Sequence, residues 1–126
     1  MLEESRLNKP PRGRDLRPQE RALVEKMLAG KDVKPGIEAT LSSVLVEDMS
    51  DGGMGSIRFL KSNESERRLG KAVAKAEYTD EDGVLVSIVI NVDRDGDLYE
   101  ADFWKVDFSP LKRYPRASDI TIEPAE

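Results

Sequence analysis

The sequence of 126 residues contains neither cysteine nor histidine. Without cysteine the chain has no disulfide bonds, no thiolate nucleophile and no cysteine-ligated zinc or iron–sulfur site. Without histidine it lacks the side chain that most often acts as a base near neutral pH, and every histidine-ligated metal site. Any acid–base chemistry would therefore have to come from carboxyl groups with raised pKa values.

Long apolar runs are also missing from the sequence. The longest, residues 84–90, holds seven residues and is interrupted by Ser87, whereas a helix that spans a bilayer needs about 20. The first 15 residues contain no apolar segment of the kind found in secretory signals. We therefore expect a cytoplasmic protein that has no membrane partner.

The charges are distributed unevenly along the chain. Residues 1–36 carry nine Lys or Arg and six Asp or Glu, whereas residues 37–126 carry eleven and nineteen. The folded part should therefore be acidic, and we expect no nucleic-acid partner. The length suits one domain. We expect a disordered basic arm over 1–15, a single domain over 16–112 and a loosely attached tail over 113–126.

Periodicity in the first third of the chain predicts a helix over residues 16–29. Asp15 is a plausible N-cap for it and Gly30 the expected stop. A short second helix over residues 37–41 is an option after the break at Pro35-Gly36. The apolar residues of the first helix form two i,i+4 pairs on one face: Leu23 with Met27, and Val24 with Leu28.

Short β-branched segments separated by glycine-containing turns follow. They predict strands over 44–49, 57–61, 71–79, 84–92 and 97–106. The predicted fold is α+β, a mainly antiparallel sheet of about five strands with the N-terminal helix, and optionally the second one, packed on one face. Small residues should let the helix approach the inner face of the third strand, which carries Ala72, Ala74, Ala76 and Tyr78.

The last predicted strand has an unusual division of side chains. One face carries Glu100, Asp102 and Trp104, together with apolar residues at 98 and 106, and the other carries residues 99, 101, 103 and 105. Two explanations stay open. Either a bulge re-aims the chain, or two carboxylates lie beside the only tryptophan on a partly open face.

These carboxylates are the main candidates for groups that catalyse a reaction or bind a metal. Two acids spaced by two on a strand point the same way, about 7 Å apart, which suits glycoside hydrolysis or binding of a divalent metal. The same spacing suits a solvated face on which they pair with Lys75 or Arg58. Trp104 is either a core residue or an anchor for a partner protein.

The segment Asp51-Gly52-Gly53-Met54-Gly55-Ser56 is the most unusual local feature. Consecutive backbone amides there could cradle an anion, with Arg58 close by. A phosphate-binding loop, however, leads into a helix, and here a strand follows. We favour a tight turn whose glycines adopt positive φ, and keep an anion or small-molecule site as an alternative.

The segment Asp93-Arg94-Asp95-Gly96-Asp97 superficially resembles a calcium loop. An EF-hand has glycine sixth and glutamate twelfth between two helices, whereas here glycine is fourth and strands flank the segment. We interpret this segment, and Asp80 to Gly83, as hairpin turns. We therefore predict no metal site, no cofactor and no catalytic residue.

Three strings resemble a bacterial family of small proteins whose domain has no assigned function. They are Met49 to Phe59, with its Asp-Gly-Gly-Met-Gly-Ser motif; Tyr78 to Val86; and Leu98 to Leu111, with its Trp-Lys-Val-Asp-Phe-Ser-Pro motif. The resemblance covers about residues 16–115. It implies a bacterial, cytoplasmic domain that stands alone, and it transfers no catalytic residue.

The sequence favours a non-enzymatic protein-interaction module, either an immunity-type partner of a basic protein or a homo-oligomer such as a dimer. Two alternatives stay open: a carboxylate-based, metal-dependent hydrolase, and an anion or small-molecule binder at the glycine-rich turn. The candidate binding residues are Asp51, Gly52, Gly53, Gly55, Ser56, Arg58, Glu100, Asp102 and Trp104.

Overall fold

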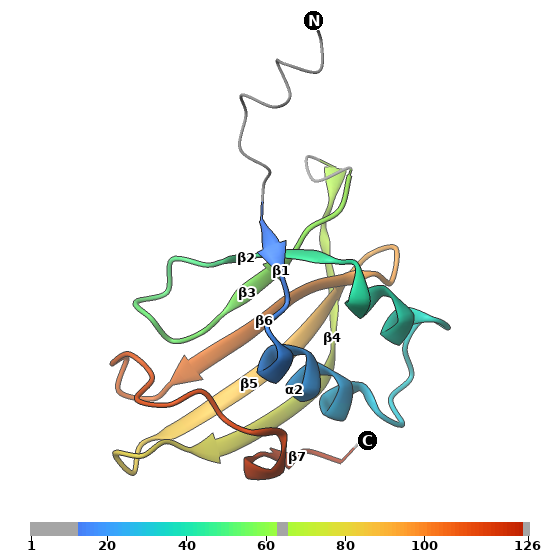
Figure 1. Cartoon of the computed structure of the whole chain (residues 1–126). Helices are drawn as coiled ribbons and strands as arrows, with labels where there is room; N and C mark the ends of the chain where they lie inside the picture. Colours follow the sequence, from blue (N-terminus) through green and yellow to red (C-terminus); the bar gives the residue numbers. More distant parts are fainter. Residues whose placement is uncertain (1–12, 63–65, 125–126) are drawn as a thin grey trace, which may run out of the picture.

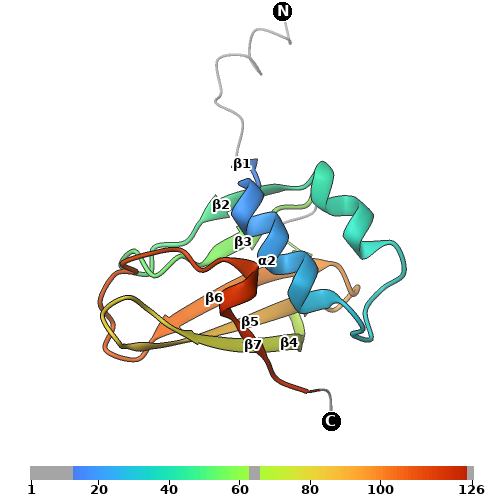
Figure 2. The same cartoon turned by 60° about the horizontal axis from the view of Figure 1, so that its bottom comes forward.

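The structure, a computed structural model, describes residues 13–62 and 66–124. One antiparallel sheet dominates it, and a helix, α2 (Pro18–Leu28), lies across one face (Figures 1 and 2). The strand order is β1-β2-β3-β6-β5-β4-β7. The strands are β1 (Arg14–Asp15), β2 (Leu45–Asp48), β3 (Ile57–Phe59), β4 (Leu69–Thr79), β5 (Leu85–Asp93), β6 (Leu98–Lys105) and β7 (Thr121–Ile122).

The prediction of an α+β fold with an antiparallel sheet is confirmed, but the number of strands is wrong. Seven strands occur in the described residues instead of about five. The two additional ones, β1 and β7, are two residues long, which is too short for an alternation of apolar and polar residues to be recognised. None of the helices in this part of the chain is long and apolar enough to cross a membrane.

Helix α2 begins one turn later than Asp15. Its N-cap is Arg17, whose backbone amide donates to the Glu20 side chain at 2.8 Å, so the assignment of Asp15 as N-cap is wrong. Asp15 is instead part of β1, where it pairs with Leu45. At the other end Gly30 has φ +74°, as expected of a glycine that stops a helix.

The apolar stripe of α2 lies in the core. The optional second helix is present as a 3₁₀ helix, η1 (Ile37–Ser42), and it contributes Ile37 and Leu41 to the same core. The four predicted residues of α2 are at most 1% exposed: Leu23, Val24, Met27 and Leu28.

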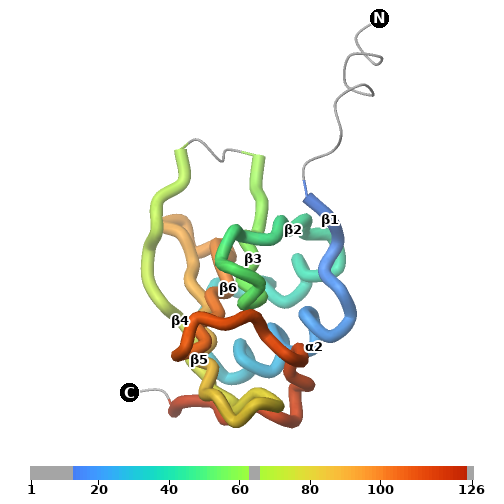
Figure 3. The backbone as a smooth tube through the Cα atoms, turned by 90° about the vertical axis from the view of Figure 1, so that its left-hand side faces the viewer, coloured from blue at the N-terminus to red at the C-terminus, as the bar shows by residue number. Residues whose placement is uncertain are grey.

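The inner face of the sheet follows the predicted alternation on β5, where residues 86, 88, 90 and 92 are buried. On β4 the alternation breaks. Ala74, Ala76 and Tyr78 are buried, but Ala72 is exposed, because the register shifts between Ala72 and Ala74. A bulge of this kind turns the preceding residues to the other face, and Figure 3 shows how strongly β4 bends. The expectation for Ala72 was therefore wrong.

On β6 both explanations of the divided strand apply. The register shifts beside Tyr99, because Asn91 pairs with Glu100 whereas Val92 pairs with Leu98. This shift returns Leu98 to the buried side, where it is 6% exposed. Beyond it the strand is regular, so alternate residues from Glu100 onward point away from the core.

The alternation also carries a charged residue into the core. Lys105 at the end of β6 is fully buried, and its Nζ donates to Asp80 at 2.9 Å, to Asp82 at 2.6 Å and to the Pro110 carbonyl at 3.0 Å. Burial alone would raise the pKa of Asp80. The hydrogen bonds from the Lys112 amide and from Lys105 outweigh burial and hold this pKa below its usual value.

This lysine cluster joins the β4–β5 turn to the chain that follows β6. That chain then packs on the domain: the rings of Tyr114 and Phe103 lie 5.5 Å apart, and Ile120 is buried. A 3₁₀ turn, η3 (Ala117–Asp119), lies beside α2 (Figure 2) and leads into β7. Within the segment expected as a loosely attached tail, Thr121 and Ile122 thus form an edge strand of the sheet. Of the basic arm expected over 1–15, residues 1–12 lie outside the described residues.

Replacing Lys105 with methionine should strongly destabilise the fold. The change leaves the buried Asp80 carboxylate without its cation, and losing one partner of a buried pair is among the more costly single changes. We expect the melting temperature to fall by about 10–20 °C, measured by circular dichroism. Lys112→Met is the control, because only the backbone amide of Lys112 takes part. Equal melting temperatures for the two variants would contradict the assigned role of Lys105.

Candidate functional site

The face of the sheet away from α2, here called the outer face, carries the residues that the core does not use. The strands β4, β5 and β6 lie side by side (Figure 1), and cross-strand pairing places their residues in rows. One row joins Glu77, Ser87 and Trp104, and the next joins Lys75, Val89 and Asp102. Trp104 and Asp102 are thus neighbours on one strand, about 7 Å apart.

Exposed apolar side chains gather at one end of this face. Trp104 is 53% exposed, and its ring centroid lies 6.2 Å from that of Phe108, which is 67% exposed. The amide of Val106 donates to Leu85 at 3.0 Å, which places these two partly exposed residues opposite each other. We call Leu85, Trp104, Val106 and Phe108 the apolar corner. A contiguous exposed patch of this kind marks an interaction site more often than scattered apolar residues do.

The backbone of Phe108 is strained. Its φ is +63°, the one positive φ at a non-glycine residue in the described part of the chain. A left-handed conformation costs a bulky residue about 1–3 kcal/mol, and an exposed ring recovers little of this by burial. The turn that imposes it is closed by the Phe108 amide, which donates to the Lys105 carbonyl at 2.8 Å. The stability of the fold does not explain a phenylalanine at this position.

The two predicted carboxylates are both on the outer face, but their surroundings differ. Glu100 accepts a hydrogen bond from Arg58 Nη2 at 2.6 Å, across the pairing of β3 with β6. Asp102 accepts one from the neutral Asn91 amide at 3.0 Å. Burial raises the pKa of Asp102 to about 6, the neighbouring Glu100 adds to this rise, and Arg58 and Asn91 oppose it.

A cleft of about 470 Å³ adjoins the apolar corner. It lies between the end of β4 and the segment that leads to β7, and both Glu77 and Leu85 line it. Arg113 and Arg116 are on its other wall, and each faces an acid at 3.5 Å, Glu81 and Asp119 respectively. Glu77 thus lines the same cleft as Leu85, a residue of the apolar corner.

The glycine-rich turn is held by its own aspartate. Asp51 accepts hydrogen bonds from the amides of Met54 at 3.0 Å and Ser56 at 2.9 Å. The side chain thus occupies the position that an external anion would take at these two amides. Gly52, Gly53 and Gly55 all have positive φ, as the interpretation of a tight turn required.

Two of these glycines also make room for the chain after β6. A Cβ on Gly53 would lie 3.2 Å from Pro110, and one on Gly55 would lie 3.1 Å from Leu111. Ser56 is buried and accepts a hydrogen bond from the Phe103 amide at 2.9 Å. The turn therefore supports the loop that carries Phe108.

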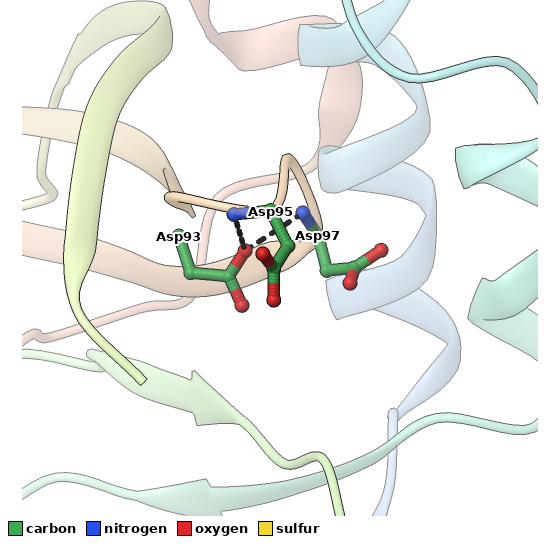
Figure 4. A group of neighbouring side chains, drawn as sticks. All are labelled: Asp93, Asp95 and Asp97. Atoms are coloured by element: carbon green, nitrogen blue, oxygen red, sulfur yellow. Dashed lines mark hydrogen bonds between the residues drawn. The ribbon is translucent and has the colours of Figure 1, made fainter. Parts of the chain in front are cut away.

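The acidic turn between β5 and β6 brings three carboxylates together. Carboxylate oxygen atoms of Asp93, Asp95 and Asp97 lie within 4.8 Å of one another. The Asp93 carboxylate accepts hydrogen bonds from the backbone amides of the other two (Figure 4). Lys61 Nζ lies 2.9, 3.3 and 2.7 Å from the three in turn. Arg67 Nε also donates to Asp93 at 2.9 Å. Lys34 Nζ lies 2.8 Å from Asp97 as well, so two lysines and an arginine of the chain together balance the three carboxylates.

The structure brings four of the predicted site residues to the outer face, namely Arg58, Glu100, Asp102 and Trp104, and leaves Asp51 to Ser56 in the supporting turn. The prediction of these residues as a site stays untested. It omitted Leu85, Val106 and Phe108. Strand alternation already placed Val106 on the face of Trp104, whereas no pattern in the sequence signals the backbone of Phe108.

A family model described as "Domain of unknown function (DUF6984)" matches residues 13–115. The chain belongs to this family. The DUF6984 match spans β1 to β6, α2 and the loop that carries Phe108, and it ends before η3 and β7. No curated protein and no solved structure matches the chain. The expected membership of a family without assigned function is thus confirmed, while its bacterial origin and its specific motifs stay predictions.

Replacing Asp102 with asparagine should stabilise the domain at neutral pH. A carboxyl group whose pKa is raised by folding favours the folded state when protonated, and this contribution is lost as the pH rises from about 4 through 6. Allowing for solvent screening, we expect Asp102→Asn to raise the free energy of unfolding by about 1 kcal/mol at pH 7.5 and by almost nothing at pH 4.

Urea denaturation at both pH values measures this difference. The control is Glu38→Gln, an exposed acid on η1, which should give the same small effect at both pH values. A loss of stability in Asp102→Asn at pH 7.5 would contradict the unfavourable environment assigned to this carboxylate.

Proposed function

We propose that this DUF6984 domain is a protein-binding module and that its docking surface is the apolar corner of the outer face. The carrying observation is the pair of exposed aromatic rings, Trp104 and Phe108, with Phe108 held in a strained left-handed backbone conformation. Tryptophan beside polar groups is the typical composition of a binding hot spot.

One residue of the apolar corner, Phe108, and one beside it, Asp102, have surroundings that oppose the stability of the isolated domain. Phe108 adopts a conformation that glycine would adopt without cost, and Asp102 is ionised beside Glu100 at neutral pH. Residues that are less favourable for stability than another residue would be at the same position are typical of functional sites. They support a partner that covers the outer face in the assembled state.

The rigid parts around the corner also suit recognition. The Lys105 cluster and the glycine-rich turn hold the chain before and after Phe108. A surface held in place loses little conformational entropy when it binds. A partner would therefore meet the two rings already arranged for contact.

Photo-cross-linking in the native host tests this proposal. Benzoylphenylalanine replaces Ser87, which pairs with Trp104, or, as the control, the exposed Leu69 at the far end of β4. We expect a discrete cross-linked product from position 87 and none from position 69. Trp104→Ser and Phe108→Gly should each abolish the product, because an anchor residue contributes about 2 kcal/mol or more to binding.

Phe108→Gly separates binding from folding. Glycine relieves the positive φ, so we expect the free energy of unfolding to equal or exceed that of the wild type in urea denaturation. A product that persists in both variants would contradict the proposed docking surface, and so would an equal product from position 69.

A further inference from the structure

We infer, on the basis of the proposed function, that the apolar corner receives a partner segment that combines apolar side chains with lysine or arginine. The inference rests on the charges that border the corner. Glu77 and Asp102 lie beside it in the sheet and Asp107, which accepts hydrogen bonds from Ser109, lies beside it in the chain. We call these three acids the acidic rim. Glu77 shares a row with Trp104, Asp102 precedes it by two residues on β6, and Asp107 lies between Val106 and Phe108.

Most cations near the acidic rim are bonded to acids outside it. Arg58 is bonded to Glu100 and acts on Asp102 from there. Arg113 and Arg116, which line the cleft together with Glu77, face Glu81 and Asp119. Lys75 is two residues from Glu77 on β4, but it lies two strands away from Asp102. The remaining nearby lysine, Lys105, is buried on the other face and is saturated by Asp80, Asp82 and Pro110. A partner cation would therefore improve the electrostatic environment of the rim.

Asp102 is the best placed of the three to receive such a cation. It is only partly exposed, its hydrogen-bonded neighbour on β5 is the neutral Asn91, and the adjacent carboxylate of Glu100 repels it. A lysine or arginine covering this position would offset that repulsion in a site that the apolar partner residues shield from water.

The same charges argue against a second copy of the chain as the occupant. A two-fold contact through the apolar corner would bring both acidic rims together, with three carboxylates from each copy. Like charges that meet in an interface oppose association. The rim therefore selects a cationic partner over self-association.

Titration with heptapeptides tests the inference, because Trp104 is the only tryptophan of the chain and its emission reports on the corner directly. Four tryptophan-free peptides are compared. In three of them isoleucine or leucine alternates with lysine, with glutamate or with glutamine, and in the fourth lysine alternates with serine. We expect a saturable change in emission with the lysine–apolar peptide, with an affinity at least tenfold above that of the glutamine–apolar peptide.

A double variant, Glu77→Gln with Asp102→Asn, should reduce the preference for the lysine–apolar over the glutamine–apolar peptide at least threefold. The matched control is Glu25→Gln with Glu38→Gln, which has the same net charge but changes exposed residues of α2 and η1. The control should bind as the wild type does. Binding of the glutamine–apolar peptide should be the same in all three proteins.

The outcomes separate the two proposals. Equal binding of the lysine and glutamine peptides would overturn the cationic partner and leave the docking surface standing. The absence of a saturable change with the lysine–apolar peptide would overturn the inference. The docking surface itself is tested separately, by the cross-linked product at position 87. A dimer in sedimentation velocity that Trp104→Ser dissociates would replace the cationic partner with a second copy.

Discussion

The fold depends on one buried ammonium group. Lys105 Nζ, at the end of β6, joins its own strand to the turn after β4, 23 to 25 residues earlier, and to the carbonyl of Pro110, five residues later. A charge in the core is tolerated only when it is paired and fully hydrogen-bonded, so these parts must meet in one arrangement. Phe108 lies between Lys105 and Pro110, and its exposed position follows from that arrangement. The feature that stabilises the core thus also presents the apolar corner.

Much of the sheet could be predicted from the sequence because strand alternation has a strict period of two. The burial of residues 86, 88, 90 and 92 follows from it, and so does the placement of Glu100, Asp102 and Trp104 on one open face. The exposure of Ala72 could not be predicted, because a bulge depends on how β4 fits β5. The strands β1 and β7 could not be predicted either, since two residues carry no periodicity.

The site was harder to predict than the fold because its parts depend on tertiary contacts. Alternation placed Lys105 on the inner face, but it does not specify the acceptors, which come from Asp80, Asp82 and Pro110. The glycine-rich turn was recognised as unusual, whereas its role became visible only through the approach of Gly53 to Pro110. Phe108 carries no local signal, since glycine or asparagine normally occupies such a backbone position.

The bulge in β4 has a consequence for solubility. Strand β7 pairs with β4 only at Ala76 and Glu77, so within the described residues the first half of β4 borders no other strand on that side. A long flat border of this kind invites another chain to add a strand and so begin aggregation. The bulge between Ala72 and Ala74 distorts this border, and the exposed charges of Lys71 and Lys75 flank it. The irregular backbone and the two positive charges together oppose the addition of further strands at this border.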